Sequence, residues 1–164
     1  MNDNVKQLAW ALDIIASRCP RGLAAIVGEA NPPTYDELVA AATWRPAEEW
    51  EGAHGTRHTE GPVPLLAEKV MAVTAPLEKV GWDAIMAAGR EVRTLFPQDW
   101  EAYRLHITYI DAPIQWRTGD QTTLEKIAAY CRMDTRTLLR RRRQVPERIA
   151  RGALLGVQRS LDLA

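Results

Sequence analysis

Apolar residues recur at intervals of three and four along most of the chain, and this period constrains the fold more than any other feature. It predicts a first helix over 5–19, capped by Asn4 or Asp3. Residues 23–27 are expected to add a short helical turn. Strand-forming residues are scarce, so we expect an all-α bundle of about six to eight helices with a C-terminal helix-turn-helix. The other predicted helices are 34–44, 65–73, 81–95, 100–109, 124–131, 135–143 and 146–161.

Proline and glycine mark the predicted helix ends. Thr74-Ala75-Pro76 is expected to break or kink one helix, and Val145-Pro146 is expected to end another and start the last. The most loop-like stretch is 46–64. It suggests an N-terminal helical region over 1–60, for interaction or dimerisation, and a helical domain over 61–164.

Composition places the chain among ordinary globular proteins, with 46% apolar and 26% charged residues in 164. The apolar runs are too short for a bilayer, and the first residues lack the pattern of a signal peptide. Cys19 and Cys131 lie too far apart for a disulfide framework or a zinc knuckle. We expect a cytoplasmic protein with two reduced thiols and no membrane contact.

A net charge of zero conceals an uneven distribution of charge along the chain. Residues 1–60 carry a net charge of −4, residues 61–121 carry −2, and residues 122–164 carry +6. An acidic body with a basic C-terminal end indicates a local site for a polyanion.

Residues 122–144 have the pattern of a helix, a three-residue turn and a second helix. Thr122-Thr123-Leu124-Glu125 is a predicted capping box for the first helix. Ala128 is small enough for a second helix to cross closely, and Asp134 is placed to cap that second helix. This spacing is typical of a helix-turn-helix, whose second helix enters the DNA major groove. Arg132 stands where the turn usually has glycine.

A helical wheel with Leu138 and Leu139 inward predicts which side chains of the second helix face outward. Thr137, Arg140 and Gln144 point out, and Arg136 and Arg141 flank them. Arg142 falls near the inward side, so we expect it to snorkel or to pair with an acid, while Arg143 lies on the shoulder. Arginine forks suit guanine or phosphate, and Tyr130 and Thr135 could donate to phosphate. The predicted DNA-binding set is Tyr130, Arg132, Thr135, Arg136, Thr137, Arg140, Arg141, Arg143 and Gln144.

A set of short sequence segments between residues 85 and 155 has a recognisable spacing. The segments are Glu91-Val92-Arg93-Thr94-Leu95, Trp100-Glu101-Ala102-Tyr103, Tyr109, Trp116, Leu124-Glu125-Lys126-Ile127-Ala128 and Thr135-Arg136-Thr137-Leu138-Leu139-Arg140-Arg141. With this spacing, the region resembles small phage- and prophage-encoded regulators of the ArpU/RinA type, late-gene activators and antiterminator-like proteins, whose C-terminal part is similar to region 4 of bacterial sigma factors. The resemblance implies sequence-specific binding of double-stranded DNA, contact with RNA polymerase, and a DNA-reading role for Thr135, Arg136, Thr137, Arg140 and Arg141.

Other interpretations of the same residues stay open. The arginine helix could be a solvated structural hairpin, or could dock RNA polymerase or another acidic partner, with Trp44 and Trp50 as anchors. A small-terminase-like DNA-packaging subunit would carry the same motif. His54 and His58 have a metal-ligand spacing, but glycine and loop residues surround them, so we expect no metal. Since no catalytic or phosphate-loop signature is present, we expect no cofactor and no enzyme activity. A homodimer is possible, through the N-terminal helices.

Overall fold

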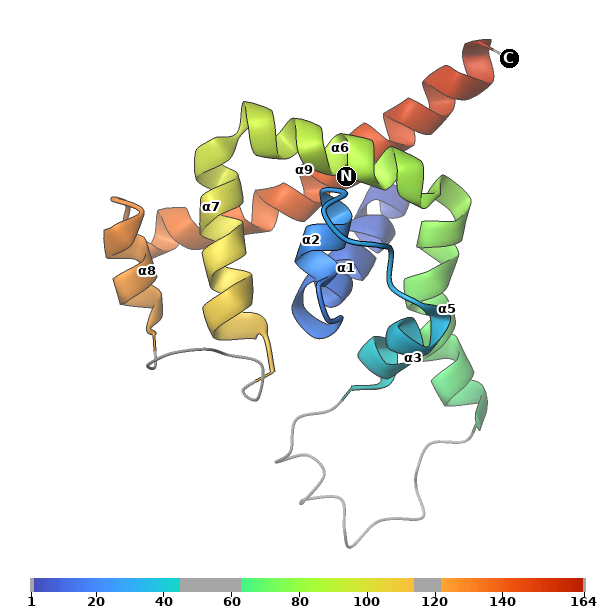
Figure 1. The fold of residues 1–164 in the computed structure, drawn as a ribbon, viewed down its shortest axis with the longest axis horizontal. Coiled ribbons are helices and arrows are strands. Elements are labelled where there is room, and N and C mark those ends of the chain that lie inside the picture. The colour runs from blue at the N-terminus through green and yellow to red at the C-terminus, as the bar shows by residue number, and fades with distance from the viewer. Residues whose placement is uncertain (1, 45–62, 114–121, 164) are drawn as a thin grey trace, which may run out of the picture.

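A computed structural model describes residues 2–44, 63–113 and 122–163, and every regular element in these ranges is a helix (Figure 1). The all-α prediction is therefore confirmed. The elements are α1 (Asp3–Arg18), α2 (Gly22–Ile26), α3 (Tyr35–Thr43), α5 (Val63–Val80), α6 (Trp82–Leu95), α7 (Pro97–His106), the π-helical η2 (Ile107–Asp111), α8 (Leu124–Tyr130) and α9 (Thr135–Leu163). None of these helices is long and apolar enough to cross a membrane.

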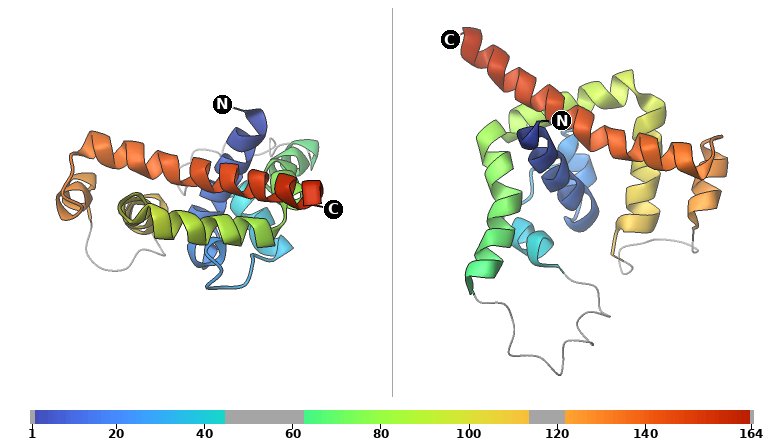
Figure 2. Two further views of the ribbon diagram at one scale, coloured as in Figure 1. Left: turned by 90° about the horizontal axis from the view of Figure 1, so that it is seen from above. Right: turned by 180° about the vertical axis from the view of Figure 1, so that it is seen from behind.

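The main hydrophobic core forms around α1, which packs against α9, α5 and α2. Leu8, Leu12 and Ile15 of α1 are almost completely buried. They share this core with Ile85 of α6 and Ile149 of α9, so it draws on both sides of residue 60. α9 runs across the whole molecule, and its last turns extend past the body (Figures 1 and 2).

Helix starts follow the capping chemistry of the sequence, with a different capping residue at two places. The Thr34–Glu37 capping box is present, with the Glu37 N–H donating to Thr34 Oγ1 at 3.2 Å. Asn2 caps α1 in place of the predicted Asn4 or Asp3, and Thr123 caps α8 in place of Thr122, the first residue of the predicted box. α1 therefore begins earlier than predicted, at Asp3, whereas α8 begins at residue 124 as predicted.

Two helices run through prolines that we predicted as breaks or kinks. α5 continues through Pro76, and α9 continues through Pro146 as one helix of 29 residues. An interior proline costs about 3 kcal/mol because it removes one backbone hydrogen bond and crowds the preceding turn. The neighbouring Val145 and Ile149 are almost fully buried, and each such side chain contributes about 1.5–3 kcal/mol. Tertiary packing therefore outweighs the local penalty, and the predicted helix end at Val145-Pro146 is wrong.

Both cysteines are free, as predicted. Burial and the nearby Glu37 carboxylate raise the pKa of the Cys19 thiol to about 12. Cys19 therefore acts as a small core residue and stays protonated at neutral pH.

The close crossing of α2 and α6 depends on Gly89. A Cβ atom at this position would lie 2.2 Å from the carbonyl oxygen of Ile26, which is backbone and cannot move aside cheaply. We expect Gly89→Ala to lower the free energy of unfolding by about 1–3 kcal/mol in urea titrations, because the two helices must separate.

Gly156→Ala is the matched control, since this glycine is also helical and nothing lies within 4 Å of the point that a Cβ atom would occupy. It should leave stability unchanged or raise it by about 0.5–1 kcal/mol. Equal losses for the two variants would contradict the close-approach explanation.

Candidate nucleic-acid interface

α8 and α9 are joined by a tight turn over residues 131–134. The Arg132 N–H bonds to the Ala129 carbonyl at 3.1 Å, and the Met133 N–H bonds to the Ala128 carbonyl at 3.0 Å. These two bonds form a Schellman motif, which requires a left-handed residue after the helix. Arg132 takes that conformation with φ 58°. An arginine thus occupies the strained position usually given to glycine, which places an exposed cation at the turn.

A small second core fixes this hairpin to α7. Ile127 and Ala128 of α8 and Leu138 of α9 are buried against Ala102 and Leu105 of α7. Cys131, Met133 and Leu124 pack against the same cluster at its edge. The hairpin of α8 and the start of α9 is therefore packed against α7. It lies at one end of the molecule, where α8 is labelled in Figure 1.

Asp134 starts α9 by accepting the Thr137 N–H at 2.6 Å on its Oδ1 atom. The predicted cap is therefore confirmed. Hydrogen bonds from the Thr137 backbone and side chain lower the pKa of the Asp134 carboxyl, with a smaller effect from Arg136 and Arg140. The carboxylate fixes the first turn of the helix and lies close to two of its arginines.

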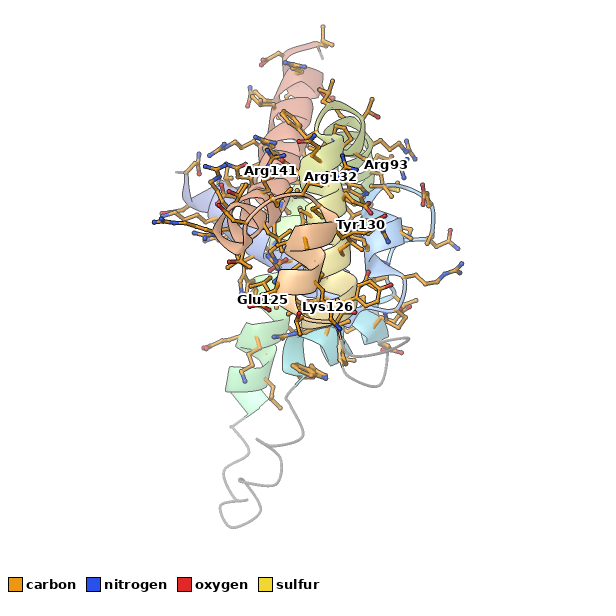
Figure 3. All side chains as sticks on the ribbon, turned by 90° about the vertical axis from the view of Figure 1, so that its left-hand side faces the viewer. Arg93, Glu125, Lys126, Tyr130, Arg132 and Arg141 are labelled. Atoms are coloured by element: carbon orange, nitrogen blue, oxygen red, sulfur yellow. The ribbon has the colours of Figure 1, made fainter. Side chains whose placement is uncertain are left out.

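Four arginines at this end are exposed: Arg132 in the turn, and Arg136, Arg140 and Arg143 on α9. The last three are spaced four and three residues apart, so they share one face of the helix. None of the four forms an ion pair within the part of the chain that the structure describes. Tyr130 is 72% exposed beside them. Figure 3, viewed from this end, shows Lys126, Tyr130 and Arg132 on the hairpin facing the viewer.

Arg141 lies apart from this set. Its Nη1 donates to Gln98 Oε1 at 2.7 Å and lies 3.4 Å from Asp99 Oδ1, so the guanidinium is held against α7. Asp99 also pairs with Arg148, whose guanidinium stacks 3.7 Å from the centre of the Phe96 ring. The predicted outward position of Arg141 is therefore wrong.

The reason is the orientation of α9. Leu138 is fully buried, but Leu139 is 36% exposed, so the inward direction follows Leu138 alone. Relative to the predicted helical wheel, α9 is rotated about its own axis by roughly 50°, which is half of the angle of about 100° between successive residues. This rotation moves Arg136, Arg140 and Arg143 to the centre of the exposed face and Arg141 toward α7.

Arg142 is largely buried and paired, which confirms the prediction that it would find an acid. Its Nη2 lies 2.9 Å from Asp13 Oδ1 on α1 and 2.5 Å from Asp111 Oδ2 at the end of η2. The guanidinium also lies 5.4 Å from the ring centre of Tyr103, whose hydroxyl donates to Asp13 Oδ1 at 3.2 Å. We call Asp13, Tyr103, Asp111 and Arg142, together with His106, the arginine clamp.

His106 completes the clamp, with Nδ1 2.8 Å from Asp111 Oδ2. Burial opposes ionisation of Asp111, but hydrogen bonds from His106 and Arg142 outweigh it and lower the pKa of this carboxyl. Burial and the Asp13 carboxylate raise the pKa of Tyr103, which therefore keeps the proton that it donates. Burial works against the charge on Arg142, yet the two carboxylates raise its pKa overall.

No local sequence signal marks the partners of Arg142 in the clamp. Asp13 and Asp111 lie 129 and 31 residues from Arg142, and they meet it only because α1, η2 and α9 converge. Asp111 ends a π-helical turn, whereas the sequence predicts a helix that stops at residue 109, before Asp111. The inward position of Arg142 on the wheel is the one available clue.

The remaining predicted residues have mixed placements. Thr135, Thr137 and Gln144 are half-buried near the start of α9. Trp44 is half-buried, with the Arg18 guanidinium 4.9 Å from its ring centre, so part of its surface is already used. Trp50, His54 and His58 lie outside the described residues. Within the described ranges, no group of His, Cys, Asp or Glu is placed to hold a metal ion.

No family model matches the chain, and no curated protein or solved structure matches it.

Arg142→Met should destabilise the protein, because it leaves Asp13 and Asp111 without their shared cation. Breaking a buried ion pair costs about 3–5 kcal/mol, and the partial exposure of both carboxylates reduces the expected loss to about 2 kcal/mol. Arg140→Met is the control on the same helix and should change stability by less than about 0.5 kcal/mol. Urea titrations of both variants measure the difference, and equal stabilities would show that the clamp contributes nothing.

The clamp should also make stability depend on acid pH. Because the folded protein lowers the pKa of Asp111 below its ordinary value of 3.8, the unfolded chain binds more protons as the pH falls. The stabilisation is therefore present above that value and is lost as the pH drops through the folded pKa. We expect the loss of stability below about pH 4 to be steeper in the wild type than in Asp111→Asn. Identical pH profiles would contradict this assignment.

Proposed function

We propose that the chain is a non-enzymatic double-stranded DNA-binding protein, a transcriptional regulator of phage or prophage type. In this proposal it binds the duplex through the N-terminal part of α9. One observation carries this proposal. Arg132, Arg136, Arg140 and Arg143 are exposed together on a packed helical hairpin, with no carboxylate paired to them in the described part of the chain. Unpaired cations on a rigid support are suited to bind a polyanion at low entropic cost.

The dimensions of the arginine face fit a DNA groove. Arg136 and Arg143 are seven residues apart, which is about 10 Å along a helix, and the major groove is about 12 Å wide. An arginine fork can donate two hydrogen bonds to guanine or to a phosphate. Tyr130 and Arg132, on the neighbouring turn, are placed to contact the phosphate backbone beside the groove.

Pairing within the protein separates the functions of neighbouring arginines. Arg141 and Arg142 are bound to carboxylates of α7, α1 and η2, so they support the hairpin. Arg140, between Arg136 and Arg143 on the exposed face, remains available to a ligand. DNA contact is therefore assigned to the exposed set, and Arg141 is excluded from it.

The double variant Arg136→Ala with Arg140→Ala should weaken binding to a short duplex while keeping the helical content. Loss of two arginine contacts should cost about 1–3 kcal/mol each where a base is read. The slope of log affinity against log salt should fall by about one for each lost phosphate contact. Fluorescence anisotropy with a labelled duplex at several salt concentrations measures both quantities.

Lys6→Ala with Lys79→Ala is the charge-matched control, because both lysines are exposed on other helices. Its affinity and salt slope should stay close to wild type. The proposal fails if the wild-type protein does not bind duplex DNA, or if the arginine variant binds as the lysine control does. If an acidic protein is the true partner, capture from a lysate would survive nuclease treatment, and the DNA affinity would be absent.

A further inference from the structure

The C-terminal end of α9 is a helix with little of its own chain around it. Its last turns extend past the body in Figures 1 and 2. Leu155, Leu161 and Leu163 are 55%, 67% and 89% exposed. Helical turns without packing are marginal in water, and exposed leucines add no stability to them. This end of the helix is therefore suited to be covered.

A groove lies beside this end, between α6 and α9. It is an open surface hollow of about 600 Å³, and a second open hollow of about 200 Å³ continues it along the same two helices. Small residues line much of it, including Ala84, Ala87, Gly152 and Gly156. Nothing lies within 4 Å of the position a Cβ would take on Gly156, so the groove is open at this point and an added methyl group would meet no atom of the same chain.

The two walls of the groove carry opposite charges. Asp83 and Glu91 stand on the α6 wall, and Arg151 and Arg159 stand on the α9 wall. The residues of each pair are eight positions apart, about 12 Å along a helix. None of these four groups forms an ion pair with any residue that the structure describes.

We propose that this groove receives the C-terminal end of α9 from a second copy of the chain, in a two-fold homodimer. In this arrangement α6 and α9 of both copies form a four-helix cluster. The incoming helix carries Arg159, which would lie opposite Asp83 of the acidic wall, and Asp162, which would lie opposite Arg151 of the basic wall. The same surface thus supplies both the groove and the helix that fills it, as a two-fold interface requires.

The directions of the three exposed leucines indicate that the C-terminal end of α9 binds in a groove and not on a flat surface. Leu155, Leu161 and Leu163 are six and two residues apart, so they point in different directions around the helix. A flat surface would cover one of them, whereas a helix lying between two walls is covered on several sides. This proposal does not rest on DNA binding, because the arginine face lies at the other end of α9.

The test exchanges charges between the two walls. Asp83→Arg and Arg159→Asp each place like charges opposite one another at both symmetric contacts, so each variant alone should raise the dimer dissociation constant at least about tenfold. An equimolar mixture of the two variants should recover dimers, because in the heterodimer both contacts pair opposite charges. Sedimentation equilibrium without DNA measures all three samples and the wild type.

Met71→Glu on α5 is the control, since Met71 is 62% exposed and lies outside the groove. It should associate as the wild type does. A wild type that stays monomeric would overturn the proposal, as would single variants that still form dimers or a mixture that stays monomeric. Circular dichroism should show the same helical content in all samples, because the substituted residues are exposed.

Discussion

The bond between Arg142 and the two carboxylates of Asp13 and Asp111 is the interaction on which the arrangement of this protein depends. It joins the first helix, the π-helical turn and the last helix through one guanidinium. Rotation of α9 would expose the buried side chains of Leu138, Val145 and Ile149, at about 1.5–3 kcal/mol each. It would also move the largely buried Arg142 guanidinium away from both carboxylates and leave all three charges unpaired. The clamp and this apolar face together determine which side chains of α9 reach solvent.

With that rotation fixed, one helix uses the same residue type in three ways. Arg142 faces the core and supports the fold. Arg141, the preceding residue, contacts α7, where it shares the Asp99 carboxylate with Arg148. Arg140 and its neighbours at Arg136 and Arg143 are exposed and form no ion pair with any described carboxylate. The cationic surface thus consists of the arginines that form no ion pair with the described carboxylates. The net charge of the segment alone does not identify these arginines.

Much of this could be predicted from the sequence, and the failures have a common physical cause. Local rules that act over one helical turn predict the all-α class, the Asp134 cap and the inward position of Arg142. Local rules do not predict that α9 continues through Pro146, because buried contacts with distant helices outweigh the local penalty of the proline. The helical wheel wrongly predicts that Leu139 is buried, and the reason is the same. A leucine favours burial, but the neighbouring helices bury only Leu138. Asp13 and Asp111 could not be predicted because no local rule links them to Arg142.

The most direct test of DNA binding by the exposed arginine face is a nuclear magnetic resonance titration of the isotopically labelled full chain with a short duplex. We expect amide and arginine Nε signals to change at the α8–α9 turn and along the first two turns of α9, around Arg132, Arg136 and Arg140. The signals of Arg142 and of α1 should stay in place, since the clamp holds them inside the protein. Changes confined to other helices, or an unchanged spectrum at saturating duplex, would contradict the assignment of this face to DNA.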